Sequence, residues 1–123
     1  MAVTISNPLV ITFNGATKNL AKINQDNYGS EYFLNEGTQS FRVKIRHTKE
    51  SPTSTGVQLD RHNVELTWVQ AASGDIPAIT TQAYVVLRDD AGRVAATDLE
   101  YVVGALTGLL TTDNVGALFG WVN

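Results

Sequence analysis

The sequence contains no cysteine, so it can form neither a disulfide framework nor a thiolate zinc site, and nothing in it indicates an oxidising compartment. It also lacks any apolar run that approaches the roughly 18 residues of a membrane-spanning helix. The N-terminal stretch MAVTISNPLVITFNG has no basic leader and no uninterrupted apolar core. We therefore expect a protein that is neither secreted nor transmembrane.

Motifs of common enzyme classes are missing as well. There is no GxSxG, no phosphate-binding P-loop and no GxGxxG, and His47 and His62 lack an HExxH pattern, which argues against a catalytic zinc. The adjacent acids Asp89 and Asp90 precede Gly92, a pattern more typical of a turn than of an acid–base pair. We do not expect an enzyme.

Length and composition indicate one domain. A chain of 123 residues with 43% hydrophobic residues is ordinary for a globular protein that builds its own core. No internal repeat, low-complexity tract or linker interrupts it. We expect a single domain over residues 1–123, mainly β over 1–96 and mainly helical over 97–123.

Charge is unevenly distributed along the chain. The formal net charge is −3, yet residues 42–61 hold five cations against two acids, a local charge of +3. Residues 1–41 sum to −1 and residues 62–123 sum to −5. This segregation argues against a generally basic protein but allows a basic stripe that faces a polyanion.

Alternating patterns predict five or six antiparallel strands. Asn14-Gly15 separates two alternating runs, and Asn-Gly is the preferred pair for a two-residue hairpin loop. Loops are indicated by KESPTSTG and by QAASGDIPAIT, which contain glycine and proline. The further strands are expected around residues 31–34, over the basic segment FRVKIRHTKE at 41–50, over VQLDRHNVELTWVQ at 57–70, and over TTQAYVVLR at 80–88.

The basic strand should carry its cations on one face, because successive side chains of a strand point to opposite sides. The next strand alternates in the same way and offers an apolar face that needs cover. On these strands the expected polar faces are Arg42, Lys44, Arg46 and Thr48, and Asn63, Glu65 and Thr67; the expected apolar faces are Val43, Ile45 and His47, and Val64, Leu66 and Trp68.

The C-terminal part changes to a helical period. Residues 97–111, TDLEYVVGALTGLLT, place apolar residues at helical spacing, and Thr97 with Glu100 matches a capping box. A second helix is expected over 113–119, with Thr112 as its N-cap and Gly120 at its end. We predict an α+β fold whose helices lie on one face of an antiparallel sheet and leave the charged face bare.

Two glycines, Gly104 and Gly108, lie four residues apart in the longer helix. Each costs about 1 kcal/mol relative to alanine in a helix interior. They either allow close packing on another chain, which favours a dimer, or are simply tolerated.

A bare face with several cations and Tyr84 suits single-stranded nucleic acid, because phosphates meet Arg and Lys while bases stack on the ring. The alternative is an ordinary solvated face. Composition alone slightly favours the solvated face, since three alternating cations occur on many exposed strands.

The order and spacing of several strings resemble the coat proteins of single-stranded RNA bacteriophages, the leviviruses. The strings are KINQDNYGSEYFL, SFRVKIRHTKES, RHNVELT, TTQAYVVLR and DLEYVVGALTGLL, and they are most similar to coat proteins of the Caulobacter-infecting branch. The resemblance covers nearly the whole chain.

This resemblance implies an intertwined homodimer with one continuous sheet, in which each subunit's helices reach over the partner's strands. Dimers would assemble an icosahedral capsid in the bacterial host cytoplasm, giving a virion protein whose inner sheet face binds packaged genomic RNA. Members of the family also repress replicase translation by binding an RNA hairpin. The RNA-binding residues carried over are Arg42, Lys44, Arg46, Thr48, Arg61, Asn63, Glu65, Thr67, Arg88 and, as the base-stacking residue, Tyr84.

Four positions depart from the family's pattern. Lys44 and Arg46 replace small hydroxyl residues of the adenine pockets, Glu65 replaces a basic residue, and Val86 replaces a polar one. Long cations suit phosphate contacts, which position RNA without reading its sequence. We therefore expect RNA packaging to outweigh sequence-specific repression. Glu65 would face phosphate unfavourably unless Arg46, Arg61 or Arg88 pairs with it.

The rival interpretation is a stand-alone dimeric RNA-binding regulator that shares the basic face but forms no shells. No cofactor is evident from the sequence. Surface acids permit a calcium ion between subunits, but none has the spacing of an EF-hand loop, so the metal question stays open.

Overall fold

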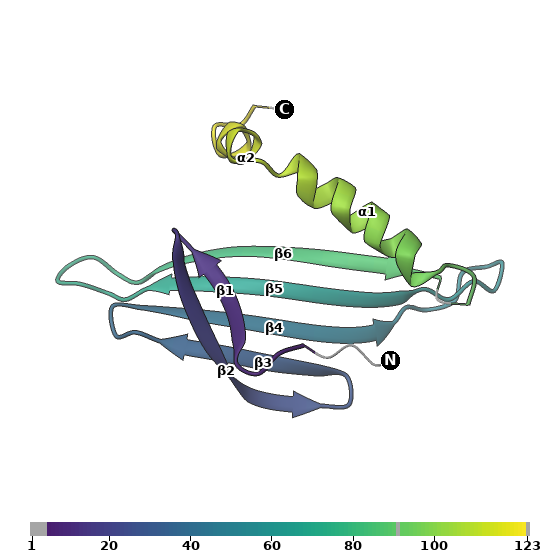
Figure 1. Cartoon of the computed structure of the whole chain (residues 1–123), viewed down its shortest axis with the longest axis horizontal. Coiled ribbons are helices and arrows are strands. Elements are labelled where there is room, and N and C mark those ends of the chain that lie inside the picture. Colours follow the sequence, from purple (N-terminus) through teal and green to yellow (C-terminus); the bar gives the residue numbers. More distant parts are fainter. Residues whose placement is uncertain (1–4, 91, 123) are drawn as a thin grey trace.

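The computed structural model describes residues 5–90 and 92–122. Six antiparallel strands follow one another in the sheet in chain order, and two helices come last (Figure 1). The α+β fold predicted above is thereby confirmed. The elements are β1 (Leu9–Phe13), β2 (Ala16–Asp26), β3 (Gly29–Asn35), β4 (Gln39–Lys49), β5 (Asp60–Gln70), β6 (Ile79–Asp89), α1 (Ala96–Leu109) and α2 (Thr112–Phe119).

The N-terminal hairpin turns at Asn14 and Gly15, as predicted. Their φ values are 50° and 76°, the left-handed conformations that a two-residue hairpin loop requires. The first part of β2 pairs with β1, and from Ala21 onward β2 pairs with β3, with a register shift between Lys22 and Asn24. Figure 1 shows the result: the hairpin crosses the strands of the main sheet instead of extending it in the same plane.

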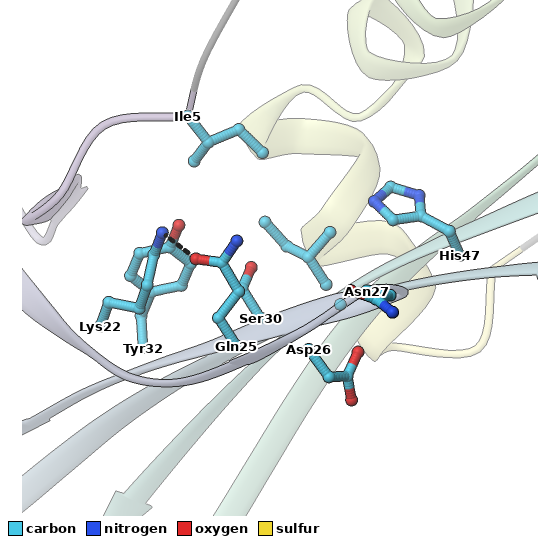
Figure 2. A pocket seen from close by; sticks show the side chains of 10 residues that line it. Ile5, Lys22, Gln25, Asp26, Asn27, Ser30, Tyr32 and His47 are labelled. Atoms are coloured by element: carbon cyan, nitrogen blue, oxygen red, sulfur yellow. Dashed lines mark hydrogen bonds between the residues drawn. The ribbon is translucent and has the colours of Figure 1, made fainter.

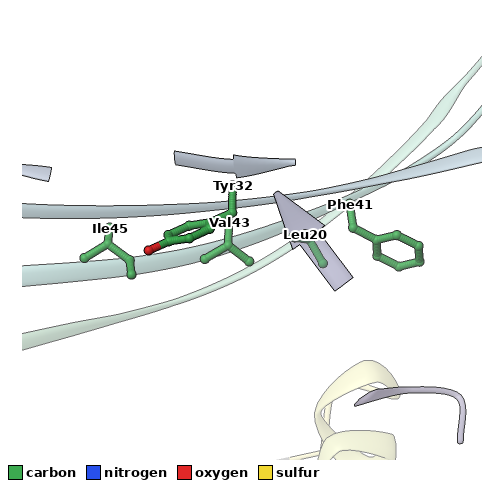
Figure 3. Close-up of a cluster of buried hydrophobic side chains, with 5 residues drawn as sticks. All are labelled: Leu20, Tyr32, Phe41, Val43 and Ile45. Atoms are coloured by element: carbon green, nitrogen blue, oxygen red, sulfur yellow. The ribbon is translucent and has the colours of Figure 1, made fainter. Parts of the chain in front are cut away.

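The hairpin covers part of one sheet face and forms the core there. Leu20 of β2, Tyr32 of β3 and Phe41 of β4 are almost completely buried. Figure 3 shows these side chains together with Val43 and Ile45, the apolar side of the basic strand. The predicted alternation of β4 is therefore confirmed, since one of its faces is the core and its other face carries the cations.

Aromatic rings link the hairpin to the sheet. The centroid of the Phe13 ring lies 4.9 Å from that of Phe41, in an edge-to-face contact, and 4.8 Å from that of Trp68, in a tilted contact. Aromatic pairs prefer such geometries to flat stacking. The core therefore reaches from β1 as far as β5 on this face. Beyond it the apolar face is less well covered, since Val64 is 41% and Ile79 47% exposed.

The helix α1 begins shortly after the C-terminal end of β6 and extends away from the sheet, and α2 follows it (Figure 1). In Figure 3 they lie on the side toward which the core side chains point, so they leave the charged face bare, as expected. No residue of α1 or α2 is buried. Among the described residues, no single helix is long and apolar enough to cross a membrane, although α1 and α2, bent by 66°, pass that test when taken together.

Both predicted helix caps need correction. The N-cap of α1 is Ala95, which has no side chain able to cap, so the capping box of Thr97 and Glu100 was wrong. A turn in which the backbone N–H of Val94 donates to the carbonyl of Asp90 brings the chain into the helix before Thr97. In α2 the capping hydroxyl belongs to Thr111, which accepts from the backbone N–H of Asn114.

Candidate nucleic-acid interface

The candidate site is the sheet face opposite the core, which we call the polar face. Antiparallel pairing places directly opposed residues on the same side of a sheet. The register of β4, β5 and β6 therefore assembles the predicted site residues into four cross-strand rows. In order, they are Arg42–Thr67–Gln82, Lys44–Glu65–Tyr84, Arg46–Asn63–Val86 and Thr48–Arg61–Arg88.

All ten predicted RNA-binding residues thus lie on one face. Tyr84 is 69% exposed, near the sheet edge formed by β6, so its ring is open to a stacking partner. Arg46 and Arg88 have side chains that are each 54% exposed. Alternation placed the residues of β4 and most of those of β5 on one face, and the resemblance supplied the others; the structure adds which of them are neighbours across strands.

Carboxylates explain how three cations can share one strand. Glu31 of β3 lies opposite Lys44, and its carboxylate is 2.7 Å from Arg42 Nη1 and 3.7 Å from Lys44 Nζ. Asp26, at the end of β2, accepts from Arg46 Nη1 at 3.1 Å. Each of these three cations is therefore held by an acid from another strand, Glu31 of β3 or Asp26 of β2.

The hydrogen bonds of Asp26 lower the pKa of its carboxyl. The backbone N–H of Tyr28, and then the Arg46 guanidinium, lower the pKa of the Asp26 carboxyl below its usual range. Gly29 makes room for this arrangement, because a Cβ at that position would lie 2.4 Å from the Ile45 carbonyl oxygen and 2.9 Å from Arg46 Cδ. The Arg46 side chain passes over the Gly29 backbone to reach Asp26.

Arg88 is also held by an acid. Its Nε and Nη2 donate to the two oxygens of Glu50 at 2.5 and 2.7 Å, a bidentate pair. These hydrogen bonds lower the pKa of the Glu50 carboxyl and raise the pKa of Arg88. The guanidinium therefore stays charged. Its Nε and Nη2 atoms, which could bind a phosphate in the same bidentate way, are already bound to the Glu50 carboxylate.

Glu65 is hydrogen-bonded to neutral side chains. Its Oε1 accepts from Thr67 Oγ1 at 3.3 Å and from Gln82 Nε2 at 3.1 Å, and no described arginine pairs with it. The condition that one of Arg46, Arg61 and Arg88 neutralises Glu65 is thus not met among the described residues. The physical reason is competition, because Asp26 and Glu50 hold two of these arginines, while Arg61 Nε donates to the amide oxygen of Asn63 at 3.2 Å.

Sequence reasoning missed one aromatic residue of the polar face. Phe33 of β3 lies directly opposite Arg42, and the Arg42 Cζ atom is 4.6 Å from the centre of its ring. That distance is well within the range of a cation–π contact. The alternation of GSEYFLN puts Glu31 and Phe33 on one face, but only the register shows that this face is the one that Arg42 shares.

The histidines lie on the opposite face. His47 and His62 face each other across β4 and β5 with their Nδ1 atoms 2.9 Å apart, and His62 Nε2 is 3.0 Å from Asp89 Oδ2. Asp89 is the last residue of β6, while Asp90 takes part in a turn with Arg93, so the predicted turn is confirmed for Asp90 and was wrong for Asp89. Within residues 5–90 and 92–122 no group of three or more His, Asp or Glu side chains is arranged to hold a metal ion.

A depression of about 350 Å³ lies on the core side, below the turn between β2 and β3. Figure 2 shows Ile5 above it and Lys22 donating to Gln25, with Tyr32 behind. The Asp26 carboxylate points away from these side chains, in keeping with its bond to Arg46. Ser30 and His47 both line the depression, but the His47 Nδ1 atom is paired with His62 rather than with Ser30.

Freeing Arg88 should strengthen the attraction of the polar face for RNA. In Glu50→Gln the guanidinium loses its anionic partner, and one more phosphate contact steepens the salt dependence of single-strand binding by about 0.7 in log–log slope. Titration of a fluorescent RNA oligonucleotide at several salt concentrations measures this slope. Glu36→Gln is the matched control, since it makes the same charge change but releases Lys18 on the hairpin; equal slopes for both variants would contradict the prediction.

Comparison with known proteins assigns the chain to a family. The family model described as "Phage phiCb5, coat protein" matches residues 6–90, which span all six strands. No curated protein sequence matches the chain closely enough to count as a relative. The match covers well over half of the chain, and it agrees with the six-stranded sheet followed by two helices. The chain therefore belongs to the phage phiCb5 coat protein family and is a structural subunit of a bacteriophage capsid.

Proposed function

We propose that this coat protein forms a homodimer, assembles an icosahedral shell and packages single-stranded genomic RNA against its polar face. The observation that carries the proposal is the contrast between the two sides of the sheet. The polar face is open and presents cations and Tyr84, whereas the opposite side carries apolar surface that the chain itself does not cover. The first property suits RNA, and the second suits another copy of the chain.

Support for the dimer comes from the helices. Val102, Leu106 and Leu109 of α1 are 66%, 42% and 60% exposed, and Phe119 at the end of α2 is 90% exposed. Soluble proteins rarely leave contiguous apolar surface of this kind open. A second chain whose helices lie over the less covered half of the apolar face, near Val64, would bury both surfaces at once.

The edge of the sheet supports the same partner. β6 has eleven residues and no neighbour beyond it in the described chain, so a row of its backbone N–H and C=O groups is free to pair. Pairing with the β6 strand of a second copy would join two sheets into one. The polar faces would then form a single surface twice as wide, with both Tyr84 side chains near its middle.

Packaging is favoured over sequence-specific repression. Lys44 and Arg46 are long cations held by Glu31 and Asp26, and such groups contact phosphate without reading bases. The acids also limit the positive potential of the face, which suits weak and repeated contacts with a long RNA. Comparable affinities for a hairpin and for its scrambled sequence at one salt concentration are expected.

The second candidate is a stand-alone dimeric RNA-binding regulator. It would use the same polar face and the same dimer but would form no shells. Coat-family membership argues for the shell, and electron microscopy of the purified protein separates the two.

The double variant Lys44→Ala/Arg46→Ala tests the RNA part of the proposal. Removing two phosphate contacts should reduce the RNA copurified with the shells and flatten the salt dependence of RNA binding by about 1.4 in log–log slope. The ratio of absorbance at 260 and 280 nm reports packaged RNA, and sedimentation reports the dimer.

Lys18→Ala/Lys22→Ala is the matched control for that variant. It removes the same charge from the core side, where Lys18 and Lys22 lie over the rings of Phe41 and Tyr32. RNA content should stay close to that of the unchanged protein. Equal losses of RNA in both variants would show that net charge, rather than the polar face, governs packaging.

A further inference from the structure

We propose that Arg42, backed by the ring of Phe33, is a platform on which an RNA base stacks, rather than a contact for phosphate. The inference rests on the proposed function, in which single-stranded RNA lies on the polar face. It gives that face a second stacking site in addition to Tyr84, on β3 and β4, away from the β6 edge. The ligand class is an unpaired nucleobase, with no requirement for a particular base.

The geometry of Arg42 suits this role. Its guanidinium carbon lies over the Phe33 ring, 4.6 Å from the ring centre, so the ring backs the planar group. The Arg42 side chain is nevertheless 36% exposed. Bases stack readily on guanidinium planes as well as on aromatic rings, so the uncovered side can receive a base.

Glu31 determines which part of Arg42 is left for RNA. Its carboxylate accepts from Arg42 Nη1 at 2.7 Å and is itself only 24% exposed, so this partner is partly shielded from solvent. A phosphate would have to displace the carboxylate or bind beside it. Stacking needs neither, because it uses the flat side of the guanidinium and leaves the hydrogen bond to Glu31 intact.

The positions of the two platforms fit a strand of RNA that runs across the sheet. Arg42 belongs to the first cross-strand row and Tyr84 to the second, two strands away. Strand spacing and residue rise put their Cα atoms about 12 Å apart. Lys44 lies beside Arg42 in the row of Tyr84, where its ammonium can meet the phosphates that connect the two stacked bases.

A comparison of RNA with inorganic polyphosphate tests the assignment, because polyphosphate carries the charge of RNA without bases. Arg42→Lys keeps the positive charge but removes the planar group. We expect it to weaken binding of a short oligouridine by roughly 5- to 100-fold, the effect of losing one stacked base, and to change polyphosphate binding less than twofold. Arg88→Lys is the matched control, because Arg88 is paired with the Glu50 carboxylate and has no described aromatic ring behind it. It should not weaken oligouridine binding more than polyphosphate binding.

A second variant keeps the test decisive if Arg42→Lys disturbs the sheet locally. Phe33→Leu leaves Arg42 in place but removes the ring behind it, and it should also weaken oligouridine binding more than polyphosphate binding. Circular dichroism and dimer sedimentation confirm that each variant folds.

Equal weakening of both ligands by Arg42→Lys would make Arg42 a phosphate contact and overturn the proposal, as would no weakening of either. Failure of the proposed function looks different. In that case the unchanged protein itself would not bind oligouridine, and the stacking assignment would fall with it.

Discussion

Leu106→Asp should abolish the dimer and, with it, shell assembly. Leu106 belongs to the apolar stripe of α1 and is 42% exposed in the single chain, and in the proposed dimer the partner covers it. An aspartate there would place an unpaired carboxylate in the interface, at a cost of several kcal/mol. We expect dimerisation to weaken at least about 100-fold, since each 1.4 kcal/mol is a factor of ten.

Sedimentation and electron microscopy measure this result, and Tyr101→Asp is its control. Tyr101 is five residues earlier, about 140° around the helix, and 74% exposed, so the same charge enters on the other side of α1. Dimers and shells should persist in the control. Shells formed by Leu106→Asp would mean that the apolar stripe of α1 is not the covered surface.

Phe41→Ala should destabilise the folded chain by about 3–5 kcal/mol, the usual cost of removing a buried ring. Phe41 is fully buried, and it joins the hairpin to the sheet through its contact with Phe13. The core holds few fully buried side chains, so a cavity there has little neighbouring structure that can compensate. Urea unfolding followed by circular dichroism gives the free energy of unfolding.

Tyr84→Ala provides the comparison, because it removes a ring that is 69% exposed on the same sheet. It should change the free energy of unfolding by less than about 1 kcal/mol, as surface substitutions usually do. Similar losses in the two variants would contradict the division between a core face and an open polar face.

Strand alternation alone was sufficient to predict the polar face. Arg42, Lys44 and Arg46 had to share a side once β4 was recognised as a strand, and the core residues Val43 and Ile45 confirm that side. The acids that hold these cations could not be predicted. Glu31 comes from a neighbouring strand, and only the register places it opposite Lys44.

The same limit explains what sequence reasoning missed or left open. Phe33 shares a face with Glu31 by alternation, but its contact with Arg42 depends on the pairing of β3 with β4. Whether Glu65 has an arginine partner could not be read from the sequence either. Asp26 and Glu50 hold Arg46 and Arg88, and Glu65 accepts from Thr67 and Gln82 instead.

For the helices, the sequence pattern indicated an apolar stripe but not which chain would cover it. Leu106 and Leu109 have helical spacing, yet their own chain leaves them exposed. Gly104 and Gly108 likewise have no neighbouring atom within 4 Å of an added Cβ in the single chain. Close packing at these glycines would therefore have to involve a partner chain. The helical period predicts which residues are to be buried, but it does not predict which chain buries them.

The most direct test of the account is size-exclusion chromatography of the bacterially expressed protein, with absorbance read at 260 and 280 nm and the void peak imaged by electron microscopy. The account predicts uniform shells rich in nucleic acid. A small dimer without nucleic acid that fails to assemble when RNA is added would contradict it and favour the stand-alone regulator.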